Sequence, residues 1–380
     1  MLLDLPKMYW LLITLIFLLL YSILIFYYLN AWSKLDEYTP LATVDNKLLS
    51  VIIPARNEEK NITNLLNALA QQTYPKDFFE VIVVDDFSED ATADIVRKFP
   101  LPNLTLIQLE ISSQSSSKKK AIEAGINKAA GELIVTTDAD CIPSKFWLET
   151  INNFYVTTNA AFVAAPVKFL HDQSFLQLFQ SLDFLTLQGI TAASVSSDVH
   201  AMCNGANLAY KKEAFENVNG FEGIDKVATG DDMLLMHKIR RKYPGKIFYL
   251  KSKEAITCTQ PMLSWREFFM QRKRWASKTL VYDDYKIIAV LAFVYLLNCL
   301  FIALIIASLF HAFYWWLVLG FWLAKSIIEL PFIKAVAKFY EEKAITKYLF
   351  FFQPLHIMYT FFTGLASQFG KYEWKGRRTK

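Results

Sequence analysis

Residues 48–59 read LLSVIIPARNEE, a β-rich apolar run that passes through Pro54 into polar residues and the start of a helix. Three similar apolar runs follow, and helical stretches separate them. The predicted strands are Leu48–Ile53, Glu80–Val84, Leu104–Leu109 and Glu132–Thr137, and the predicted helices are Glu59–Gln72, Asp90–Phe99 and Lys118–Ala130. Strand–helix alternation at this spacing predicts an α/β fold, with a Rossmann-like, mostly parallel sheet and helices on both faces.

Charged residues gather at the carboxyl ends of these predicted strands. They are Arg56, Asp85, Asp86, Asp138 and Asp140. Ligands of parallel sheets bind beyond those ends, so this edge is the first candidate for a functional site.

The composition indicates a polar domain combined with a membrane part. Hydrophobic residues make up 54% of the 380 residues and charged residues 20%. The net charge of +4 favours contact with anionic lipid head groups over nucleic-acid binding, which usually needs a denser basic face. The four cysteines are widely spaced, without a C-x-x-C pair, which argues against a disulfide framework or a zinc site and indicates a reducing compartment. We expect membrane contact, with no nucleic-acid partner and no obligate protein partner.

The first membrane candidate is the apolar run Met8–Leu29, which is long enough to cross a bilayer. Aromatic residues near its ends, such as Trp10 and Trp32, match the aromatic belts of membrane interfaces. We expect a permanent anchor. A cleaved signal peptide is the alternative, but it needs a shorter apolar core and a small-x-small cleavage site.

Three further apolar segments cover residues 287–310, 313–333 and 346–369, the last interrupted by Gln353, Pro354 and His356. If the α/β domain is cytoplasmic, four lysines between residues 334 and 347 lie inside, as the positive-inside rule requires. A full fourth span would place the basic tail 371–380 outside. Pro354 offers the alternative of a re-entrant or interfacial helical pair, which keeps the tail inside. We expect an inside tail.

Lys325 and Glu329 lie one helical turn apart within the segment 313–333. An internal ion pair or a lumen-facing contact is the simplest interpretation. A role in an acceptor path is also open, because charge inside a membrane is costly.

The expected organisation has five parts: an anchor at 1–39, the α/β domain at 40–262, an amphipathic interface helix at 263–285, a membrane region at 286–370 and a basic tail at 371–380.

Two acids, Asp85 and Asp86, end the second predicted strand. Repulsion between the two carboxylates and their desolvation disfavour negative charge at this position unless a partner is present. A bound base, ribose or cation would supply that partner. An exposed acidic turn with Ser88 capping a helix is the alternative.

Asp138 and Asp140 follow the fourth predicted strand in the sequence TTDAD. On an extended chain their side chains point to opposite sides, so one can reach a sugar–ribose moiety while the other binds a divalent cation. Mg²⁺ and Mn²⁺ prefer oxygen ligands and keep waters and substrate phosphates, so one or two carboxylates suffice. An isolated D-x-D is not specific by itself.

Residues 229–233 read TGDDM, with Asp231 and Asp232 at a predicted helix start. The helix dipole alone favours acids at that position. The functional interpretation is a general base that deprotonates an attacking hydroxyl.

Residues 271–275 read QRKRW, within an amphipathic stretch that mixes aromatic and basic residues. Such a helix can lie on a membrane surface. Its arginine can also brace a diphosphate, and its indole can stack on a sugar ring.

Together and in this order, the five motifs resemble family 2 of the inverting glycosyltransferases, with the GT-A fold. They look most like the membrane members that include cellulose and hyaluronan synthases and ceramide glucosyltransferases. The resemblance covers residues 48–283 and the terminal sequence WKGR at 374–377. No single motif is specific, but five in order before membrane segments make a strong combination.

The resemblance implies nucleotide-sugar contacts for seven residues: Pro54, Arg56, Glu58, Asp85, Asp86, Lys118 and Asp138. Asp86 would contact the base, with Asp85 the weaker candidate, and Asp138 would lie near the ribose and sugar. Lys118 matches a lysine that often precedes the following helix, although the usual glycine before it is Ser117 here. Asp140 would hold Mg²⁺ or Mn²⁺.

The resemblance also implies a catalytic set and an acceptor side. The catalytic set is Asp232, Asp231, Gln271, Arg274 and Trp275. Asp232 matches the base, while position 231 is often Glu in relatives and is Asp here. The acceptor side would be Asn204, Gly205 and Trp275.

By resemblance, the expected function is inverting transfer of a sugar from a UDP-hexose or UDP-N-acetylhexosamine to a membrane lipid or cell-envelope glycan, at the cytoplasmic face of a bacterial-type inner or plasma membrane. The first alternative is a processive polysaccharide synthase, for which three or four spans are few. The second is a non-catalytic nucleotide-binding membrane scaffold, against which the intact acid set argues.

Overall fold

The computed structural model describes residues 4–40, 45–109, 118–199, 202–225, 230–277, 284–368, 372–374 and 377–379. The chain divides into two compact units. The helical unit comprises Met1–Leu35, His171–His200 and Met262–Tyr372, and the sheet unit comprises Asp36–Leu170, Ala201–Pro261 and Glu373–Lys380. Parts of the motifs around Ser117, Thr229 and residues 278–283, and of the tail, lie outside the described residues.

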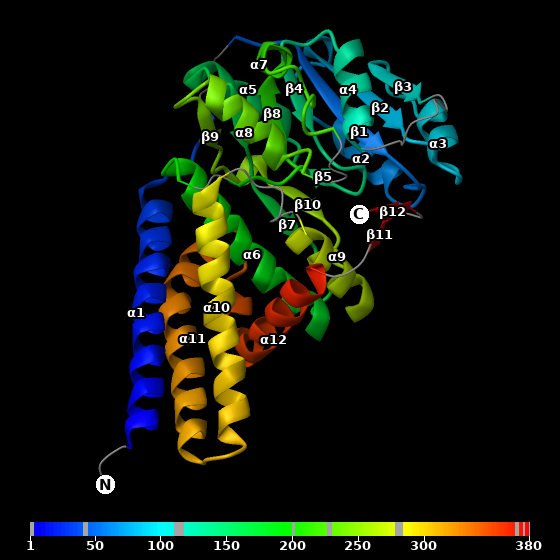
Figure 1. Ribbon diagram of the computed structural model, residues 1–380. Coiled ribbons are helices and arrows are strands. Elements are labelled where there is room, and N and C mark those ends of the chain that lie inside the picture. Colours follow the sequence, from blue (N-terminus) through cyan, green and yellow to red (C-terminus); the bar gives the residue numbers. More distant parts are fainter. Residues whose placement is uncertain are drawn as a thin grey trace. The chain divides into compact units, whose positions relative to one another are not determined.

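A seven-stranded sheet in the order β3-β2-β1-β4-β8-β6-β9 forms the sheet unit (Figure 1). Its strands are β1 (Leu49–Ala55), β2 (Phe79–Asp85), β3 (Leu104–Gln108), β4 (Leu133–Thr136), β6 (Phe162–Ala164), β8 (Leu208–Lys211) and β9 (Ile247–Tyr249). β1 pairs in parallel with β2 and β4, β2 pairs in parallel with β3, and only β8 runs against its neighbours β4 and β6. The predicted mostly parallel sheet and its first four strands are confirmed.

Helices cover both faces of this sheet, as the fully buried strand β1 requires. The helices are α2 (Ile62–Ala70), α3 (Thr92–Lys98), α4 (Lys118–Lys128), α5 (Trp147–Thr158), α7 (Lys212–Asn217) and α8 (Met233–Lys242). Val51 and Ile53 of β1 join the core formed with α2 and α5. Ile52 points to the other face, where α4 comes so close that a Cβ at Gly125 would lie 2.6 Å from Cγ2 of Ile52.

Two small sheets were not predicted. β5 (Ile142–Pro143), β10 (Thr257–Thr259) and β7 (Val167–Phe169) form one, and β11 (Tyr372–Trp374) pairs with β12 (Arg377–Thr379) in the other. Short 3-10 turns occupy Lys76–Phe78 and Lys253–Ala255. Strands of two or three residues are too short to show a hydrophobic period.

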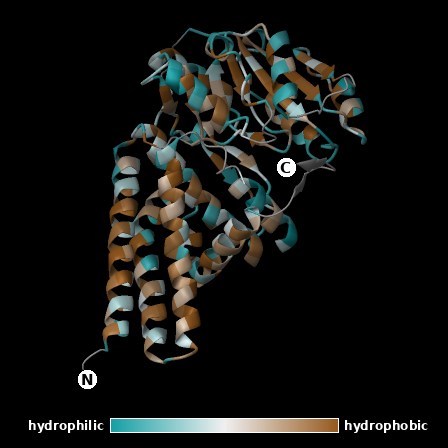
Figure 2. Cartoon of the chain, viewed as in Figure 1, coloured by the Kyte–Doolittle hydropathy of each residue, from teal (hydrophilic) through white to brown (hydrophobic). Residues whose placement is uncertain are grey.

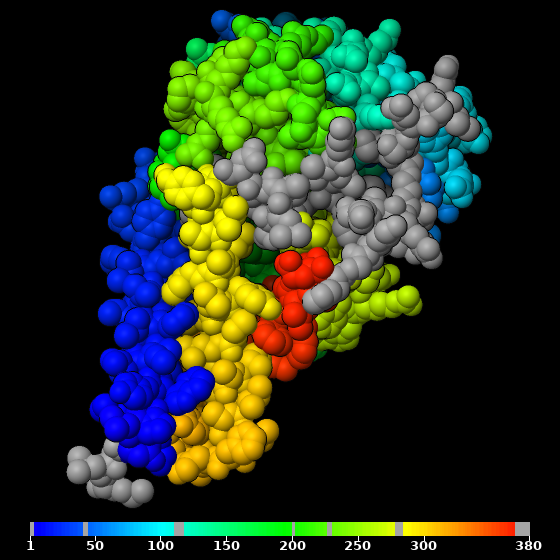
Figure 3. Space-filling model, in the orientation of Figure 1, coloured from blue at the N-terminus to red at the C-terminus, as the bar shows by residue number. Residues whose placement is uncertain are grey.

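The helical unit contains the predicted apolar segments as long helices. They are α1 (Leu5–Lys34), α10 (Tyr285–Ser308), α11 (Phe313–Phe339) and α12 (Leu349–Ser367), the last preceded by a 3-10 turn at Lys343–Tyr348. Within the described residues, these helices and the turn give four segments long and apolar enough to cross a membrane. α1, α10 and α11 run side by side (Figure 1), their ribbons are mostly hydrophobic (Figure 2), and their side chains lie against one another (Figure 3). α12 continues through Pro354, so the alternative of a helical pair broken at this proline is wrong.

Two shorter helices complete this unit: α6 (Phe175–Ser196) and α9 (Trp265–Ser277). α6 packs so closely on α11 that a Cβ at Gly189 would lie 2.4 Å from Cγ2 of Val336. α9 carries the residues of the QRKRW motif, in the position of the predicted amphipathic helix.

Lys325 and Glu329 form the internal ion pair that their spacing predicts. Glu329 also accepts a hydrogen bond from the Tyr21 hydroxyl of α1. The Gln353 amide of α12, oriented to satisfy both neighbours, donates to Oε2 of Glu329 at 2.9 Å and accepts from Lys325. The pair thus joins α1, α11 and α12.

Candidate active site

The ends of three neighbouring strands bring the predicted acids to one edge of the sheet. Ala55 of β1 pairs with Asp85 of β2, and Ile52 pairs with Thr136 of β4. β8 runs antiparallel to β4, with Leu208 opposite Thr136, so Asn204 and Gly205 approach the same edge from the other direction. In a parallel α/β sheet this is the edge at which ligands bind.

The loops after β1 and β2 hold each other in place. Asn57 and Phe87 both adopt left-handed backbone conformations, with φ of 54° and 59°, which are costly for residues other than glycine. Nη1 of Arg56 donates to the carbonyls of Asp86 and Phe87, at 2.8 and 3.1 Å. Arg56 therefore fixes the loop that carries Asp86, in addition to any contact with a ligand.

Asp85 and Asp86 are both buried at this loop, with 3% and 4% of their surfaces exposed. Oδ1 of Asp85 accepts a hydrogen bond from the Ser88 amide at 3.3 Å, so Ser88 supports the acid rather than capping a helix with its side chain.

Pro54 and Glu58 flank the same loop. β1 pairs with β4 only as far as Ile52, so Pro54 interrupts no ladder bond to that strand. Glu58 is buried, and its Oε2 accepts a hydrogen bond from Asn61 at 2.7 Å. Its backbone amide donates to the Thr92 hydroxyl at 2.8 Å, which ties the starts of α2 and α3 together.

Lys118, the first residue of α4, lies among carboxylates from distant parts of the chain. Its Nζ is 2.5 Å from Oδ1 of Asp138 and 3.3 Å from Oδ2 of Asp231. Burial would lower the pKa of Lys118, but the charges of Asp138 and Asp231 outweigh it and raise the pKa above its usual value. The ammonium group therefore stays charged and neutralises part of the acid cluster.

Asp232 begins α8 and joins this cluster to the acceptor-side loop. Its Oδ1 accepts from the Met233 amide at 2.8 Å, as helix capping alone would explain. Its Oδ2 accepts from the Gly205 amide at 3.1 Å. A Cβ at Gly205 would lie 3.2 Å from Nζ of Lys118, so this glycine keeps the backbone close to the cluster.

Asp140 lies in a turn rather than on an extended chain. β4 ends at Thr136, and the Cys141 amide donates to the Asp138 carbonyl at 3.1 Å, which closes the turn. The prediction that Asp138 and Asp140 alternate along an extended chain is wrong for this reason. The Cys141 thiol donates to Oδ1 of Asp140 at 3.6 Å, and burial together with the charges of Asp140 and Asp138 raises the pKa of this thiol.

The donor chemistry at this edge suits a hard cation, because all the candidate ligands are carboxylate oxygens. No group of three or more His, Cys, Asp or Glu residues within the described ranges could hold a metal ion. A cation here would take one or two protein ligands and complete its shell with phosphate and water, which is how Mg²⁺ commonly binds. Asp138 already pairs with the Lys118 ammonium, so Asp140 is the better candidate for that ligand.

The remaining predicted residues, Gln271, Arg274 and Trp275, belong to α9 of the helical unit. Their roles in catalysis stay predictions. Arg272 had no predicted role; it is buried and pairs with Asp183 of α6 at 2.7 Å. The signal for it was a lone arginine among the apolar positions of an amphipathic helix.

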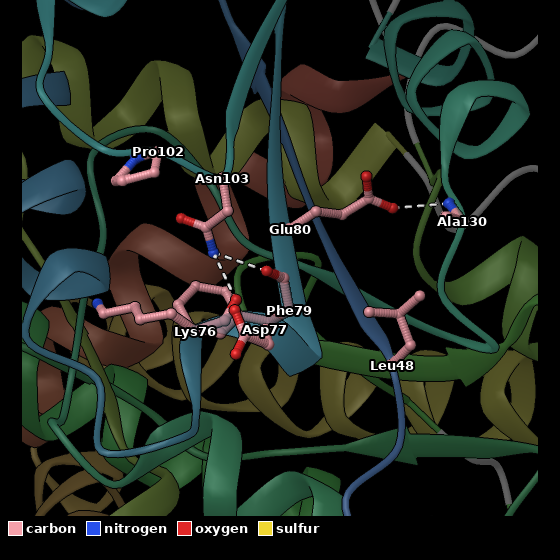
Figure 4. A pocket seen from close by; sticks show the side chains of 8 residues that line it. All are labelled: Leu48, Lys76, Asp77, Phe79, Glu80, Pro102, Asn103 and Ala130. Carbon is pink, nitrogen blue, oxygen red and sulfur yellow. Dashed lines mark hydrogen bonds between the residues drawn. The ribbon is translucent and has the colours of Figure 1, made fainter.

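A hollow of about 380 Å³ opens at the opposite edge of the sheet (Figure 4). Leu48, Phe79 and Asn103 line it near the starts of β1, β2 and β3. Asn103 donates to the Phe79 carbonyl, and Glu80 accepts from the Ala130 amide, both at 2.6 Å. This hollow lies away from the acid cluster and takes no part in the candidate site.

A mostly parallel sheet with carboxylates at its carboxyl edge is typical of Rossmann-like folds, which bind nucleotides at that edge. The model of the glycosyltransferase-like family 2 matches residues 46–278, and the chain belongs to this family. The family membership that the resemblance predicted is confirmed.

Similar proteins support both the family and the fold. Glycosyltransferase AglE of Haloferax volcanii is 31% identical over 176 residues, which cover 46% of this chain and 55% of AglE. The poly(ribitol-phosphate) beta-N-acetylglucosaminyltransferase TarS of Staphylococcus aureus is 46% identical over 92 residues, covering 24% of this chain and 16% of TarS. The chain thus spans about half the length of AglE and a smaller part of TarS.

A solved structure shares the fold over almost the whole chain. It is the mannosyltransferase PcManGT of Pyrobaculum calidifontis in complex with GDP-Man and Mn²⁺. The TM-score is 0.57 at 20% identity, over 95% of this chain and 97% of PcManGT. The predicted GT-A fold is confirmed.

Proposed function

We propose that this glycosyltransferase moves a single sugar from a nucleotide-diphosphate sugar to a membrane lipid or cell-envelope glycan, with inversion at the anomeric carbon. The observation that carries the proposal is the gathering of Lys118, Asp138, Asp231 and Asp232 at the carboxyl edge of the sheet. A bilayer-resident acceptor suits a chain whose described residues include four helices able to cross a membrane.

In this proposal Asp232 is the general base. Its two oxygens accept hydrogen bonds from the Met233 and Gly205 amides, which orient the carboxylate. Each oxygen has a second lone pair, so the carboxylate can still take the proton of an acceptor hydroxyl. The hydroxyl attacks from the face opposite the leaving diphosphate, and one displacement inverts the anomeric centre without a protein nucleophile.

The leaving diphosphate gains negative charge as the bond breaks. Lys118 supplies a fixed positive charge at this edge, and Arg274 is the second cation that the family resemblance assigns to the diphosphate. Asp140 would hold Mg²⁺ or Mn²⁺, which supplies further charge neutralisation on the diphosphate. Asp85 and Asp86 face the nucleoside in the same arrangement.

The donor stays open between two nucleotides. The resemblance favours a UDP-hexose or UDP-N-acetylhexosamine, while PcManGT was solved with GDP-Man. We place the sheet unit in the cytoplasm, at a plasma or inner membrane, because activated donors are made there and because the lysines after α11 then lie inside.

The experiment incubates purified protein with UDP- and GDP-sugars, Mn²⁺ or Mg²⁺, and a lipid extract of the native membrane. We expect one donor to give a product one sugar larger than its acceptor, whereas a long polymer would favour a processive synthase.

Asp232→Asn should lower transfer by about 10²-fold or more and leave donor binding within about twofold. The matched control is Asp77→Asn, an exposed acid at the opposite edge of the sheet, which should keep full turnover. Retained transfer in Asp232→Asn would reject the base.

A further inference from the structure

A second charged cluster lies in the helical unit, and the proposed mechanism does not use it. Asp183 of α6 is 6% exposed and lies among apolar neighbours. Three groups surround its carboxylate. Nη2 of Arg272 is 2.7 Å from Oδ2, the Tyr359 hydroxyl donates to Oδ1 at 2.6 Å, and Nε2 of His356 is 3.4 Å from Oδ1.

Arg272 connects this carboxylate to the QRKRW motif. It is 4% exposed, and its guanidinium carbon lies 4.2 Å from the centre of the Trp275 ring and 5.0 Å from that of Phe268. Trp275 is three residues further along α9, so both side chains lie on the same helix face. The centre of the Trp275 ring is also 6.2 Å from that of Phe184, the residue after Asp183. The indole thus contacts both α6 and the guanidinium.

Stability alone does not explain the buried Asp183–Arg272 pair. Nε and Nη1 of Arg272 have no hydrogen-bond acceptor among the described residues. Buried polar atoms without partners cost free energy, and apolar residues often replace a buried ion pair without loss. The Lys325–Glu329 pair of the same unit differs, because Tyr21 and Gln353 complete its hydrogen bonds.

We propose that Asp183 and Arg272 are positioning residues for Trp275, and that Tyr359 of α12 fixes Asp183 for this task. The proposal rests on the proposed function and on the catalytic and acceptor-side role that the resemblance implies for Trp275. The carboxylate sets the place of the guanidinium, and the guanidinium sets the plane of the indole through cation–π contact. Small misplacement of a positioning group lowers turnover strongly.

The test separates positioning from simple stability with two variants. Asp183→Asn removes the carboxylate charge and leaves Arg272 buried without it. Asp183→Asn/Arg272→Gln removes both charges and should recover thermal stability. We expect kcat to fall about tenfold or more in both variants, with the donor KM within about twofold of wild type. Recovery of kcat together with stability in the double variant would overturn the proposal.

The matched control is Lys325→Met/Glu329→Gln, which neutralises the other buried pair of the helical unit. It should keep wild-type kcat. An equal loss of kcat in this control would show a general response of the helices and would also overturn the proposal.

A readout independent of turnover uses ¹⁹F NMR of protein labelled with 5-fluorotryptophan, with the Trp275 resonance assigned from Trp275→Phe. The resonance should move in both Asp183 variants and stay in place in the control. An unmoved resonance contradicts the positioning. If wild-type protein transfers no sugar, the proposed function fails, while this resonance still decides the positioning.

Discussion

The Gly205 amide donates a hydrogen bond to Oδ2 of Asp232 at 3.1 Å. The two residues are 27 positions apart, one before β8 and the other at the start of α8. The bond makes the acceptor-side loop and the proposed base one unit. Movement of this loop therefore changes the direction in which the carboxylate points.

Gly205→Ala tests this link. The new Cβ would lie 3.2 Å from Nζ of Lys118, which is tighter than an ordinary contact, and 3.5 Å from Oδ2 of Asp231, which is an ordinary one. The flexible lysine end can shift, so we expect a small change in thermal stability but a loss of turnover of about tenfold. Gly320→Ala is the control, because a Cβ there meets nothing within 4 Å. Wild-type kinetics in Gly205→Ala would show that the close approach has no catalytic role.

Lys118→Met tests the charge balance of the acid cluster. In the wild type the pKa of Lys118 is raised, so its stabilising charge is present below the ordinary lysine pKa and is lost only as the pH rises through the higher folded value. Without the ammonium, the Asp138 and Asp231 carboxylates lose their counter-charge and repel each other. We expect the variant to lose on the order of 2 kcal/mol at pH 8, less than a fully buried pair, because 36% of the Asp138 side chain is exposed.

The pH dependence of this stability loss checks the prediction. The loss in Lys118→Met should stay the same from pH 6 to about 9 and shrink as the pH rises above the ordinary lysine pKa of about 10.4, because the charge of Lys118 stops stabilising the wild type there. Thermal unfolding of both proteins between about pH 6 and 11 measures the difference. A loss that does not shrink at the high end would mean that Lys118 stabilises the fold by packing alone.

Most of the sheet could be predicted from the sequence because β1, β2 and β4 are almost wholly buried and read as apolar runs. β3 is only partly buried, and its alternation of apolar and polar residues identified it. The predicted ends lie within two residues of those of β1 to β4. The three-residue strands β6, β7, β9 and β10 were not predicted, because pairing with distant strands rather than local sequence pattern stabilises them.

The candidate site was also predictable only in part. The acids that end strands were found because a charge after a buried run is conspicuous. The backbone groups that orient other site residues were not found, because they carry no side-chain signal. They are the Gly205 amide, which binds Asp232, and the Asp86 and Phe87 carbonyls, which bind Arg56. Asp183 and Arg272, 89 positions apart, also meet only in the folded chain.

Lys325→Met tests the buried pair between α1, α11 and α12. The substitution leaves the Glu329 carboxylate in an apolar bundle without its cation, so we expect a loss of about 3–5 kcal/mol in stability. The double variant Lys325→Met/Glu329→Gln should recover most of it, because Tyr21 and Gln353 can bond to a neutral amide. Thermal unfolding in detergent measures both. Equal stability of the single and double variants would contradict the assignment of an ion pair.

The membrane topology can be tested at three places. α1, α10 and α11 run side by side, whereas α12 crosses them obliquely (Figure 1) and buries Gln353 and Tyr359 against the other helices. Polar groups are tolerated at membrane depth where protein surrounds them. An oblique α12 that enters the membrane region without crossing it is therefore possible. Three spans would place the turn between α10 and α11 outside and the basic tail inside, as the positive-inside rule requires.

In a parent protein with its four cysteines replaced by serine, an impermeant maleimide should label Phe310→Cys, whose native side chain is 85% exposed, in intact cells. Lys343→Cys and a cysteine added after the tail should react only after permeabilisation, while labelling of the tail in intact cells would make α12 a fourth span.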